Sequence, residues 1–483
     1  MNGALMNGAP MNWTLALPEI VLAGVGMATL IFGVLRKQES TLLCTMFVIG
    51  GFLIAGLLVL TRTTGFGFRG QFVSDPFSAF NQILILSGAA LSSIMALDWN
   101  RSQGIARFEF PVLMLFSTVG MMIMASASNL MTLYLGLELQ SLALYVLAAF
   151  ARDDLRSSEA GLKYFVLSGL ASGLLLYGMS LVYGFSGTMD LGSLHDLLVH
   201  PESASAGLVV GIVFVLVGLA FKVSAVPFHM WTPDVYEGAP TPVTVFFATA
   251  PKVAAMSLLL RVMGTSFASL VGAWQILVVI VSIASMLLGA FAAIGQTNVK
   301  RLMAYSSIGH MGYALIGLAV GTAAGVRGTL VYMVIYVFMT AGTFGCILAM
   351  RRRGRAVEQI SDLAGLAAND PALAMALAVF MFSLAGIPLM SGFFAKLYIF
   401  LSAVQAGLWT LAVIGVLTSV VGAFYYIRII KVMYFDAPAE RFDSRPASLS
   451  FVVAATGLFT GFFFLFPAPV VAAAQAAADV LFR

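Results

Sequence analysis

Five ionisable side chains lie inside long apolar stretches of the sequence, where a charge is costly to keep. They are Glu138, Lys163, Lys222, Lys252 and Lys396. A charge at the middle of a bilayer costs about 2.5 to 3.5 kcal/mol on insertion scales. Burial favours the neutral form of lysine, which can then release and regain a proton, whereas arginine stays charged. Four lysines within apolar stretches, with no arginine expected among the buried groups, therefore predict groups that gain and lose protons, with Glu138 as the complementary acid.

Two of these residues also have a simpler interpretation. Lys163 lies six residues into an apolar segment that begins near residue 157, so its long stem can carry the ammonium group to the membrane surface. Glu138 can be a structural ion-pair partner of a lysine rather than a titrating group. Lys222, Lys252 and Lys396 lie deeper, and the same route to the surface is longer for them.

His310 adds a group that titrates near neutral pH. Ser306, His310 and Tyr313 follow spacings of four and three residues, so they share one face of a helix. A polar stripe inside a membrane needs partners or water. Two interpretations follow, a proton relay and a core histidine whose hydrogen bonds are simply satisfied.

Proline interrupts two of the apolar segments. One contains Pro227, and the other reads Gly386-Ile387-Pro388. Proline removes a backbone hydrogen bond and opens a helix. Open backbone inside a membrane is tolerated only where it is buried in protein or lines a wet cavity. We therefore expect Pro227, Gly386 and Pro388 to mark helix breaks close to the ionisable residues.

The composition indicates the fold class. Of 483 residues, 60% are hydrophobic and 10% are charged, whereas an ordinary soluble domain carries about 25% charged residues. The apolar runs are continuous, which excludes the alternating pattern of a β-barrel. We predict an all-α polytopic membrane protein with about fourteen transmembrane helices. The segments are 13–35, 41–62, 76–97, 110–127, 129–151, 157–186, 206–231, 241–264, 270–296, 300–322, 327–350, 371–403, 405–434 and 448–470.

The order of these segments predicts an internal repeat of five helices. Each repeat has its broken helix fourth, at 206–231 in the first and at 371–403 in the second. Because five is odd, consecutive repeats enter the membrane from opposite sides and are inverted, as in many transporters. Proline is also common in membrane helices generally. The predicted repeat therefore depends on the matching position of just two interrupted helices. The parts are an N-terminal three-helix segment, two repeats and a C-terminal helix, over 1–109, 110–264, 270–434 and 435–483.

The basic residues predict the orientation. With the N-terminus outside, sixteen Lys and Arg fall in inside loops and five on the outside, namely Arg62, Arg69, Arg261, Arg327 and Arg483. This bias follows the positive-inside rule and places both termini outside. The N-terminus lacks the basic region of a cleavable signal peptide, and Met11 is an alternative start to Met1.

Few residues suit a cofactor. Cys44 and Cys346 are too few for an iron–sulfur cluster, which usually takes four ligands. The four histidines show no zinc-binding spacing. We expect this chain to hold no metal or other cofactor and to bind no nucleic acid; its surroundings should be lipid, protons and water.

Three motifs resemble the antiporter-like membrane subunits of respiratory complex I. They span Gly218–Pro240, Asn298–Tyr313 and Leu384–Lys396, and so cover both predicted repeats. The chain is too short for the largest such subunit. A second sister subunit usually reads Trp-Leu-Pro-Asp and has an acidic residue in the second broken helix. Here the residues are Trp231-Thr232-Pro233-Asp234 and Lys396. They favour the remaining one of the three antiporter-like subunits.

The resemblance implies a role for each ionisable residue. Glu138 and Lys222 would form a carboxylate–lysine pair, Lys252 would be the central lysine, Lys163 and His310 connecting relay groups, and Lys396 the terminal group. It also implies a proton-translocating membrane-arm subunit of NADH:quinone oxidoreductase in the bacterial inner membrane, with both termini periplasmic. Its partners would be other membrane-arm subunits, and FMN, iron–sulfur clusters, NADH and quinone would bind to other subunits of the complex.

The resulting hypothesis is a proton path driven by quinone reduction elsewhere. A proton would come from the inside, reach Lys222 or Lys252, pass His310 and leave through Lys396, with waters between the groups. A change in the separation of Glu138 and Lys222 would tune the lysine, because an ion pair at 4 Å is worth about 4 kcal/mol at an effective dielectric constant of about 20. Two other functions stay open: a subunit of a multi-subunit cation/proton antiporter, and a membrane-arm scaffold with structural lysines.

Overall fold

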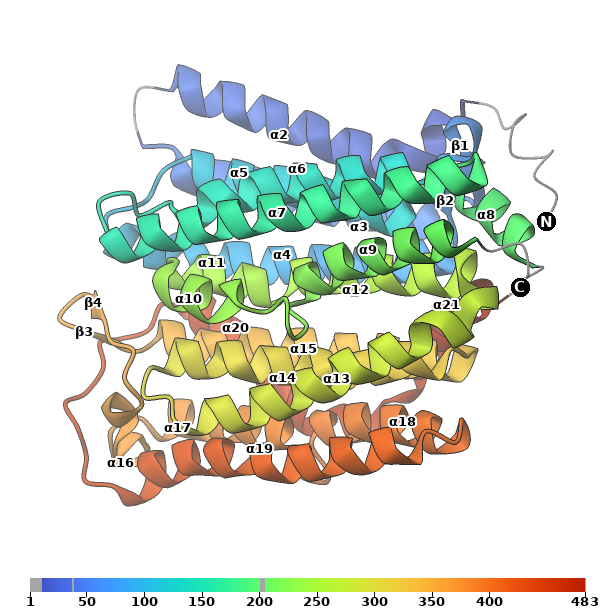
Figure 1. Ribbon diagram of the computed structural model, residues 1–483. Helices are drawn as coiled ribbons and strands as arrows, with labels where there is room; N and C mark the ends of the chain where they lie inside the picture. Colours follow the sequence, from blue (N-terminus) through green and yellow to red (C-terminus); the bar gives the residue numbers. More distant parts are fainter. Residues whose placement is uncertain (1–10, 37–38, 200–204, 483) are drawn as a thin grey trace.

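The computed structural model describes residues 11–36, 39–199 and 205–482. Within them, helices run side by side along one direction and form a single bundle (Figure 1). Two short antiparallel hairpins project from the bundle, β1 (Gly65–Gly67) with β2 (Phe72–Ser74) and β3 (Arg351–Arg352) with β4 (Arg355–Ala356). The predicted start at Met1 and two basic residues assigned to loops, Lys37 and Arg483, lie outside the described residues.

Each of the fourteen predicted segments contains at least one helix. Twelve spans among the described residues are long and apolar enough to cross a membrane. The two remaining predicted segments correspond to α14 and to the pair α17 and α18. The helices are α2 (Leu17–Leu35), α3 (Thr41–Thr61), α4 (Pro76–Ser102), α5 (Glu109–Ser126), α6 (Leu130–Ala148), α7 (Leu155–Ser186), α8 (Leu191–Leu198), α9 (Ala206–Val223), α10 (Trp231–Gly238), α11 (Thr241–Ala248), α12 (Ala250–Arg261), α13 (Val271–Ile294), α14 (Val299–Val320), α15 (Ala323–Leu348), α16 (Leu366–Asn369), α17 (Pro371–Ala385), α18 (Ser391–Gln405), α19 (Trp409–Phe435), α20 (Ala447–Phe462) and α21 (Ala468–Val480).

The two ends of the bundle carry different elements. The β1–β2 hairpin, α8 and α21 lie at one end, and the β3–β4 hairpin, α10 and α16 lie at the other (Figure 1). We call them the outer end and the inner end, after the predicted orientation. The arginine-rich β3–β4 hairpin lies at the inner end.

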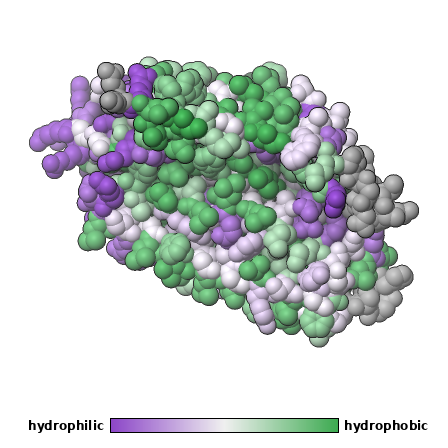
Figure 2. Space-filling view, turned by 90° about the horizontal axis from the view of Figure 1, so that it is seen from above, coloured by the Kyte–Doolittle hydropathy of each residue, from purple (hydrophilic) through white to green (hydrophobic). Residues whose placement is uncertain are grey.

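The sides of the bundle suit contact with lipid or with other membrane subunits. Figure 2 shows one side on which hydrophobic residues cover the middle, while hydrophilic residues gather mainly near one end. Exposed side chains include Leu162, Phe165 and Val166 on α7 and Val416 and Val420 on α19. Such apolar sides, with the backbone polar groups bonded inside helices, are what a bilayer requires.

The two predicted helix breaks are present, but the first begins earlier than expected. α9 ends at Val223, and Ser224 has a left-handed backbone with φ 63°. Pro227 therefore lies inside the break, and the chain becomes helical again at Trp231. Serine reaches this conformation at some cost, so the sequence carries little signal for the true end of the helix.

The second break follows the predicted residues closely. α17 ends at Ala385, and Gly386 adopts φ 88°, which glycine tolerates and other residues rarely do. Pro388 follows within the break, and α18 begins at Ser391.

The structure adds a third break and two helices that we did not predict. The segment 241–264 is divided at Thr249, and Pro251 occupies the first turn of α12, where its missing N–H costs least. In the loop predicted over 187–205, α8 buries Leu191, Leu194 and Leu198 on one face. Beyond the predicted last segment, α21 is a further short apolar helix.

Candidate functional site

Lys222 is buried where three helices meet. It is 5% exposed near the end of α9. Its ammonium group donates to the Ser141 hydroxyl of α6 at 2.9 Å and to the Ser168 hydroxyl of α7 at 2.7 Å. Ser168 also accepts a hydrogen bond from the Tyr145 hydroxyl at 2.7 Å. Hydroxyl groups rather than a carboxylate therefore solvate this lysine directly.

Glu138 lies close to Lys222 but is not bonded to it. It stands on α6 one turn before Ser141, is half-buried and interacts electrostatically with Lys222. Its Oε1 atom is buried and has no hydrogen-bond partner among the described residues. The implied carboxylate–lysine pair is thus present as two neighbours with Ser141 holding the lysine.

Lys252 holds the end of a helix that is not its own. It lies in the first turn of α12 and is 1% exposed. Its ammonium group donates to the Val223 carbonyl at 3.2 Å and to the Ser224 hydroxyl. It also lies 5.2 Å from the ring centroid of Trp231. A cation at a helix C-terminus and near an aromatic face is favourably placed.

Lys396 repeats this arrangement at the second break. Its ammonium group donates to the Leu384 and Ala385 carbonyls at 3.0 and 2.9 Å, at the C-terminal end of α17. A third bond, of 2.7 Å, reaches the Ser419 hydroxyl of α19. Lys396 is 7% exposed. At both breaks, a lysine from a following helix thus caps the carbonyl groups that the break leaves open.

His310 is buried in the middle of α14 between two tyrosine hydroxyls. Nδ1 lies 2.5 Å from the Tyr332 hydroxyl and Nε2 lies 3.2 Å from the Tyr426 hydroxyl. The Ser306 hydroxyl lies 2.5 Å from Tyr426 as well. The shared face of Ser306, His310 and Tyr313 is confirmed, since all three line one small cavity.

This cavity joins His310 to Lys396. Both residues line it, together with Thr418, Ser419 and Tyr426 among others. It measures about 10 Å³, which is room for about one water molecule. The structure therefore places His310 and Lys396 on the wall of the same small cavity.

Lys163 lies apart from these groups, at the inner end. Its side chain is 41% exposed and forms ion pairs with Glu159 at 2.7 Å and Asp234 at 2.8 Å. Arg301 bonds the other oxygen of Asp234 at 2.8 Å and pairs with Glu237 at 2.9 Å. Of the two interpretations of Lys163, the structure favours the surface position, in a network that ties α7 and α14 to α10.

Asp234 in this network gives a pH-dependent prediction. Partial burial raises the pKa of Asp234, but the hydrogen bonds from Lys163 and Arg301 bring it below its ordinary value. A depressed carboxyl pKa adds stability above the unfolded value of about 3.9, and this is lost as the pH falls through the folded pKa. Thermal melts of the detergent-solubilised protein should show Asp234→Asn less stable than wild type, by about 1 kcal/mol for so exposed a group.

The difference between these two proteins should be constant from pH 8 to about pH 5 and should vanish at lower pH, where both carry a neutral side chain at residue 234. A difference that persists unchanged at the lowest pH would contradict the ionic origin of this stability.

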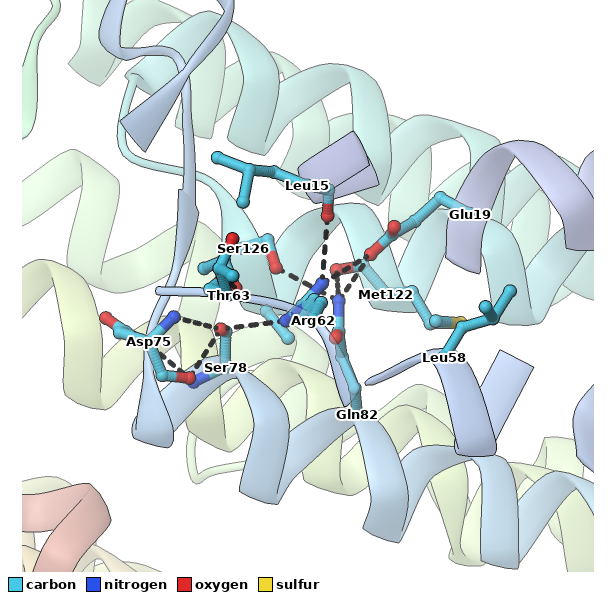
Figure 3. Close-up of polar contacts among 12 residues, drawn as sticks. Leu15, Glu19, Leu58, Arg62, Thr63, Asp75, Ser78, Gln82, Met122 and Ser126 are labelled. Atoms are coloured by element: carbon cyan, nitrogen blue, oxygen red, sulfur yellow. Dashed lines mark hydrogen bonds and ion pairs between the residues drawn. The ribbon is translucent and has the colours of Figure 1, made fainter. Parts of the chain in front are cut away.

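A second buried network lies at the outer end and was not predicted. Figure 3 shows Arg62 between Glu19 and Ser78, with Gln82 beside Glu19. Arg62 Nη1 lies 3.6 Å from Glu19, and Arg62 Nη2 donates to the Ser78 hydroxyl at 3.1 Å. Gln82 donates to Glu19 at 2.5 Å. These residues join α2, α3 and α4.

Asp75, at the start of α4, extends this network to α12. It receives two hydrogen bonds from Arg261 of α12, at 2.9 and 3.0 Å. Burial raises the pKa of Asp75, but the charge and hydrogen bonds of Arg261 bring it below its ordinary value. A bidentate pair of this kind is among the stronger side-chain contacts.

This network corrects two predictions. Arg62 and Arg261 do not lie on the outer surface: their side chains are 4% and 6% exposed. The predicted absence of arginine from the buried groups is therefore wrong. Glu19, in the first turn of α2, is buried with Arg62 and is 4% exposed. At the inner end, Lys300 is one of the sixteen basic residues assigned to inside loops, yet it is 2% exposed and pairs with Glu358. In each case the charge is buried because an opposite charge is buried with it.

The polar partners of the lysines and His310 were also missed. They are hydroxyl groups, namely Ser141, Ser168, Ser224, Tyr332, Ser419 and Tyr426. Serine is common in membrane helices and usually bonds a carbonyl of its own helix. The sequence therefore holds no signal that separates these hydroxyls from the others.

The described residues offer no site built for a metal ion. They contain no group of three or more His, Cys, Asp and Glu side chains placed to hold one. Cys44 and Cys346 are both buried and unbonded to each other.

The broken helices and the buried lysines that cap them define a class of membrane protein. Residues 127–422 match the family described as NADH:quinone oxidoreductase/Mrp antiporter, TM. This covers more than half of the chain, which therefore belongs to that family.

Curated relatives are more specific. The chain is 64% identical to NADH-quinone oxidoreductase subunit N of Granulibacter bethesdensis, over 98% of this chain and 100% of that protein. It is 57% identical to the protein of the same name from Rhodospirillum rubrum, over 96% and 97% of the two chains.

Solved structures agree on the fold. A chain of respiratory complex I from Thermus thermophilus with bound aureothin superposes with a TM-score of 0.81 at 32% identity, covering 95% of this chain and 99% of that one. A chain of the Mrp complex from Dietzia sp. superposes with a TM-score of 0.86 at 22% identity, covering 98% of both. The second likeness shows the fold alone.

Proposed function

We propose that this protein is a proton-translocating subunit of the membrane arm of a bacterial NADH:quinone oxidoreductase. Quinone reduction in other subunits supplies the free energy, and the buried Lys and His groups of this chain carry the proton. The observation that carries the proposal is the pair of lysines, Lys252 and Lys396, that cap the open helix ends at the two breaks. The relatives named NADH-quinone oxidoreductase subunit N support the assignment to this complex.

Each capping lysine links its proton to the geometry of a break. An ammonium group interacts favourably with the partial negative charge of a helix C-terminus. A neutral amine has one donor fewer and no charge, so it binds the carbonyls at the end of α9 or α17 less strongly. Loss of the proton therefore loosens a helix end, and a displaced helix end favours loss of the proton. This reciprocity follows from linkage between binding and conformation.

The order of the groups gives the route. The proton is taken up at the inner end, reaches Lys222 or Lys252, passes His310 and leaves through Lys396 toward the outer end. Glu138 tunes Lys222 through its charge, and Ser141 holds the lysine meanwhile. The small cavity between His310 and Lys396 supports the last transfer. Lys163 acts at the inner end, in the network around Asp234.

We further propose that residues 110–264 and 270–434 form inverted repeats, between the N-terminal segment 1–109 and the C-terminal segment 435–483. Support comes from the fourth helix of each part, which is interrupted and capped by lysine in both. The described chain starts and finishes near the same end of the bundle (Figure 1). We place this end on the periplasmic side of the inner membrane.

Neutral substitutions in the assembled complex test the function. Lys222→Met and Glu138→Gln should each lower the number of protons pumped per NADH oxidised, because the first removes a carrier and the second removes the charge that tunes it. Pumping is measured in membrane vesicles alongside NADH oxidation. Lys431→Met is the matched control, since Lys431 is 61% exposed at the inner end, and it should leave pumping unchanged. A Lys222→Met, Glu138→Gln double variant that assembles fully and pumps with wild-type stoichiometry would refute the proposal.

The same purified complex distinguishes the proposed function from its two alternatives. A subunit of a multi-subunit cation/proton antiporter, a class whose fold the Mrp likeness matches, would purify without flavin and iron–sulfur subunits and would respond to sodium. A scaffold subunit would tolerate the neutral substitutions once the complex had assembled. Co-purification with redox subunits together with lost pumping favours translocation over both.

A further inference from the structure

The described hydrogen bonds leave a gap in the middle of the proposed route. Lys252 bonds to Val223 and Ser224, and His310 bonds to Tyr332 and Tyr426. None of these partners connects the first set to the second. Because the proposed function requires a proton to travel from the lysines to His310, some polar group between them must complete the connection.

Four hydroxyl groups lie between the two sets. Tyr236 of α10, Ser307 of α14, and Tyr336 and Thr340 of α15 are all 3% exposed or less. The Ser307 and Tyr336 hydroxyls lie 2.8 Å apart. Tyr236 interacts electrostatically with Ser307 and Tyr336, and Thr340 lies one helical turn from Tyr336. We call these four residues the hydroxyl cluster.

The hydroxyl cluster has neighbours on both sides of the gap, and on the lysine side it reaches Lys252 through Trp231. Toward the lysines, the ring centroid of Tyr236 lies 6.3 Å from that of Trp231, and Lys252 Nζ lies 5.2 Å from the Trp231 centroid. Toward the histidine, the rings of Tyr336 and His310 lie 5.6 Å apart. Tyr332, which bonds His310, stands one turn before Tyr336 on α15.

Two members of the cluster have hydroxyl groups that are only weakly satisfied. The Tyr236 and Thr340 hydroxyls are buried and make no hydrogen bond of ordinary geometry within the described chain; each has one hydroxyl neighbour with which it interacts more loosely, Ser307 for Tyr236 and Tyr336 for Thr340. A buried polar group left unsatisfied costs about 1–3 kcal/mol. An apolar ring and an apolar methyl group would avoid that cost at both positions. Hydroxyls at this place are therefore suited to binding water, which needs two to four polar partners in a buried site.

We propose that the hydroxyl cluster is a proton-transfer bridge between Lys252 and His310, completed by water and led by Tyr236. This rests on the proposed function and names the groups that join its two halves. An N–H bond of the Lys252 ammonium breaks and an O–H bond forms on water. Each following oxygen accepts a proton on one side while it releases its own on the other. The transfer passes through Tyr236, Ser307, Tyr336 and Tyr332, and ends as an N–H bond on His310. No electron moves, and no hydroxyl keeps a net charge.

Removal of single hydroxyls tests the bridge. Tyr236→Phe and Tyr336→Phe keep the rings and their packing, and each should lower the proton-pumping rate of the assembled complex by roughly a hundredfold, the lower limit for loss of a positioned proton-transfer group. The solvent deuterium isotope effect on pumping should rise in both, because proton transfer through the bridge becomes rate-limiting. Tyr177→Phe is the matched control, since Tyr177 is 54% exposed on α7, and it should change neither quantity.

Measuring the Lys222→Met variant in parallel distinguishes a failure of the bridge proposal from a failure of the proposed function. Wild-type pumping and a wild-type isotope effect in assembled Tyr236→Phe and Tyr336→Phe complexes overturn the bridge. If Lys222→Met still loses pumping in that case, the proposed function stands and only the bridge fails. If Lys222→Met also pumps normally, both fail. Should either tyrosine variant fail to assemble, Ser307→Ala removes another hydroxyl of the same route, the one that lies 2.8 Å from the Tyr336 hydroxyl, and should lower pumping likewise.

Discussion

The Lys252→Arg variant should assemble into the complex, but the complex should lose at least about nine-tenths of its proton pumping. The arginine keeps the electrostatic contact, whereas its charge cannot be released, and this blocks the proton-transfer cycle. Arginine keeps a cation beside the Val223 carbonyl and the C-terminal end of α9, so the break remains capped. It stays protonated, however, and cannot pass a proton on. Pumping per NADH in membrane vesicles measures the loss, and the content of each subunit in the purified complex measures assembly.

Lys300→Arg is the matched control for this substitution. Lys300 is also buried, and it also donates to backbone carbonyls, those of Glu237 and Ala239, both at 2.8 Å. It differs in its firm ion pair with Glu358, at 3.0 Å, and it has no place in the proposed route. Lys300→Arg should therefore pump normally. Equal pumping by both arginine variants would mean that Lys252 acts only as a fixed cation.

Arg261→Met should destabilise the protein by about 3–5 kcal/mol, because it leaves the buried carboxylate of Asp75 without its partner. Arg261 supplies two of the hydrogen bonds to that carboxylate, at 2.9 and 3.0 Å. The expected results are a lower melting temperature of the purified complex and weaker retention of this subunit. Arg261→Gln combined with Asp75→Asn should recover part of the loss, because no unpaired charge remains.

An exposed pair gives the comparison. Arg353 and Glu440 lie 2.9 Å apart, with side chains 84% and 56% exposed, and the loss of such a pair costs about 0–1 kcal/mol. Arg353→Met should leave the melting temperature nearly unchanged. A similar small effect for Arg261→Met would show that water reaches Asp75 and that the outer network is not a rigid connection.

Much of the fold could be predicted because a bilayer makes simple demands. Long apolar runs locate the helices, and Gly386 with Pro388 locates the second break, since both residues have strong backbone preferences. The first break ends α9 at Ser224, and the third lies at Thr249. Neither residue type favours a break, so their conformations depend on contacts such as the bond from Lys252 to Ser224, which are tertiary.

The candidate site could be predicted in part for the same reason. A lysine deep in an apolar run is conspicuous because its solvation is costly, which identified Lys222, Lys252 and Lys396. Their hydroxyl partners are inconspicuous residues. Arg261 and Asp75 are 186 residues apart, and each stands near the end of an apolar segment, where a charge normally faces solvent. Only the folded chain shows that they neutralise each other.

The position of α12 between two polar anchors has a mechanical consequence. Arg261, at one end, is pinned to the N-terminal three-helix segment through Asp75, while Lys252, at the other, holds the end of α9. Lys252 and Arg261 are nine residues apart in sequence, which is about 13.5 Å of helix. If only the Lys252 contact breaks when its proton leaves, α12 is free to tilt about its fixed end at Arg261. A tilt of about 4° then moves the lysine by about 1 Å. The N-terminal helices, which lie outside both proposed repeats, would then be the fixed support for a movement within the first.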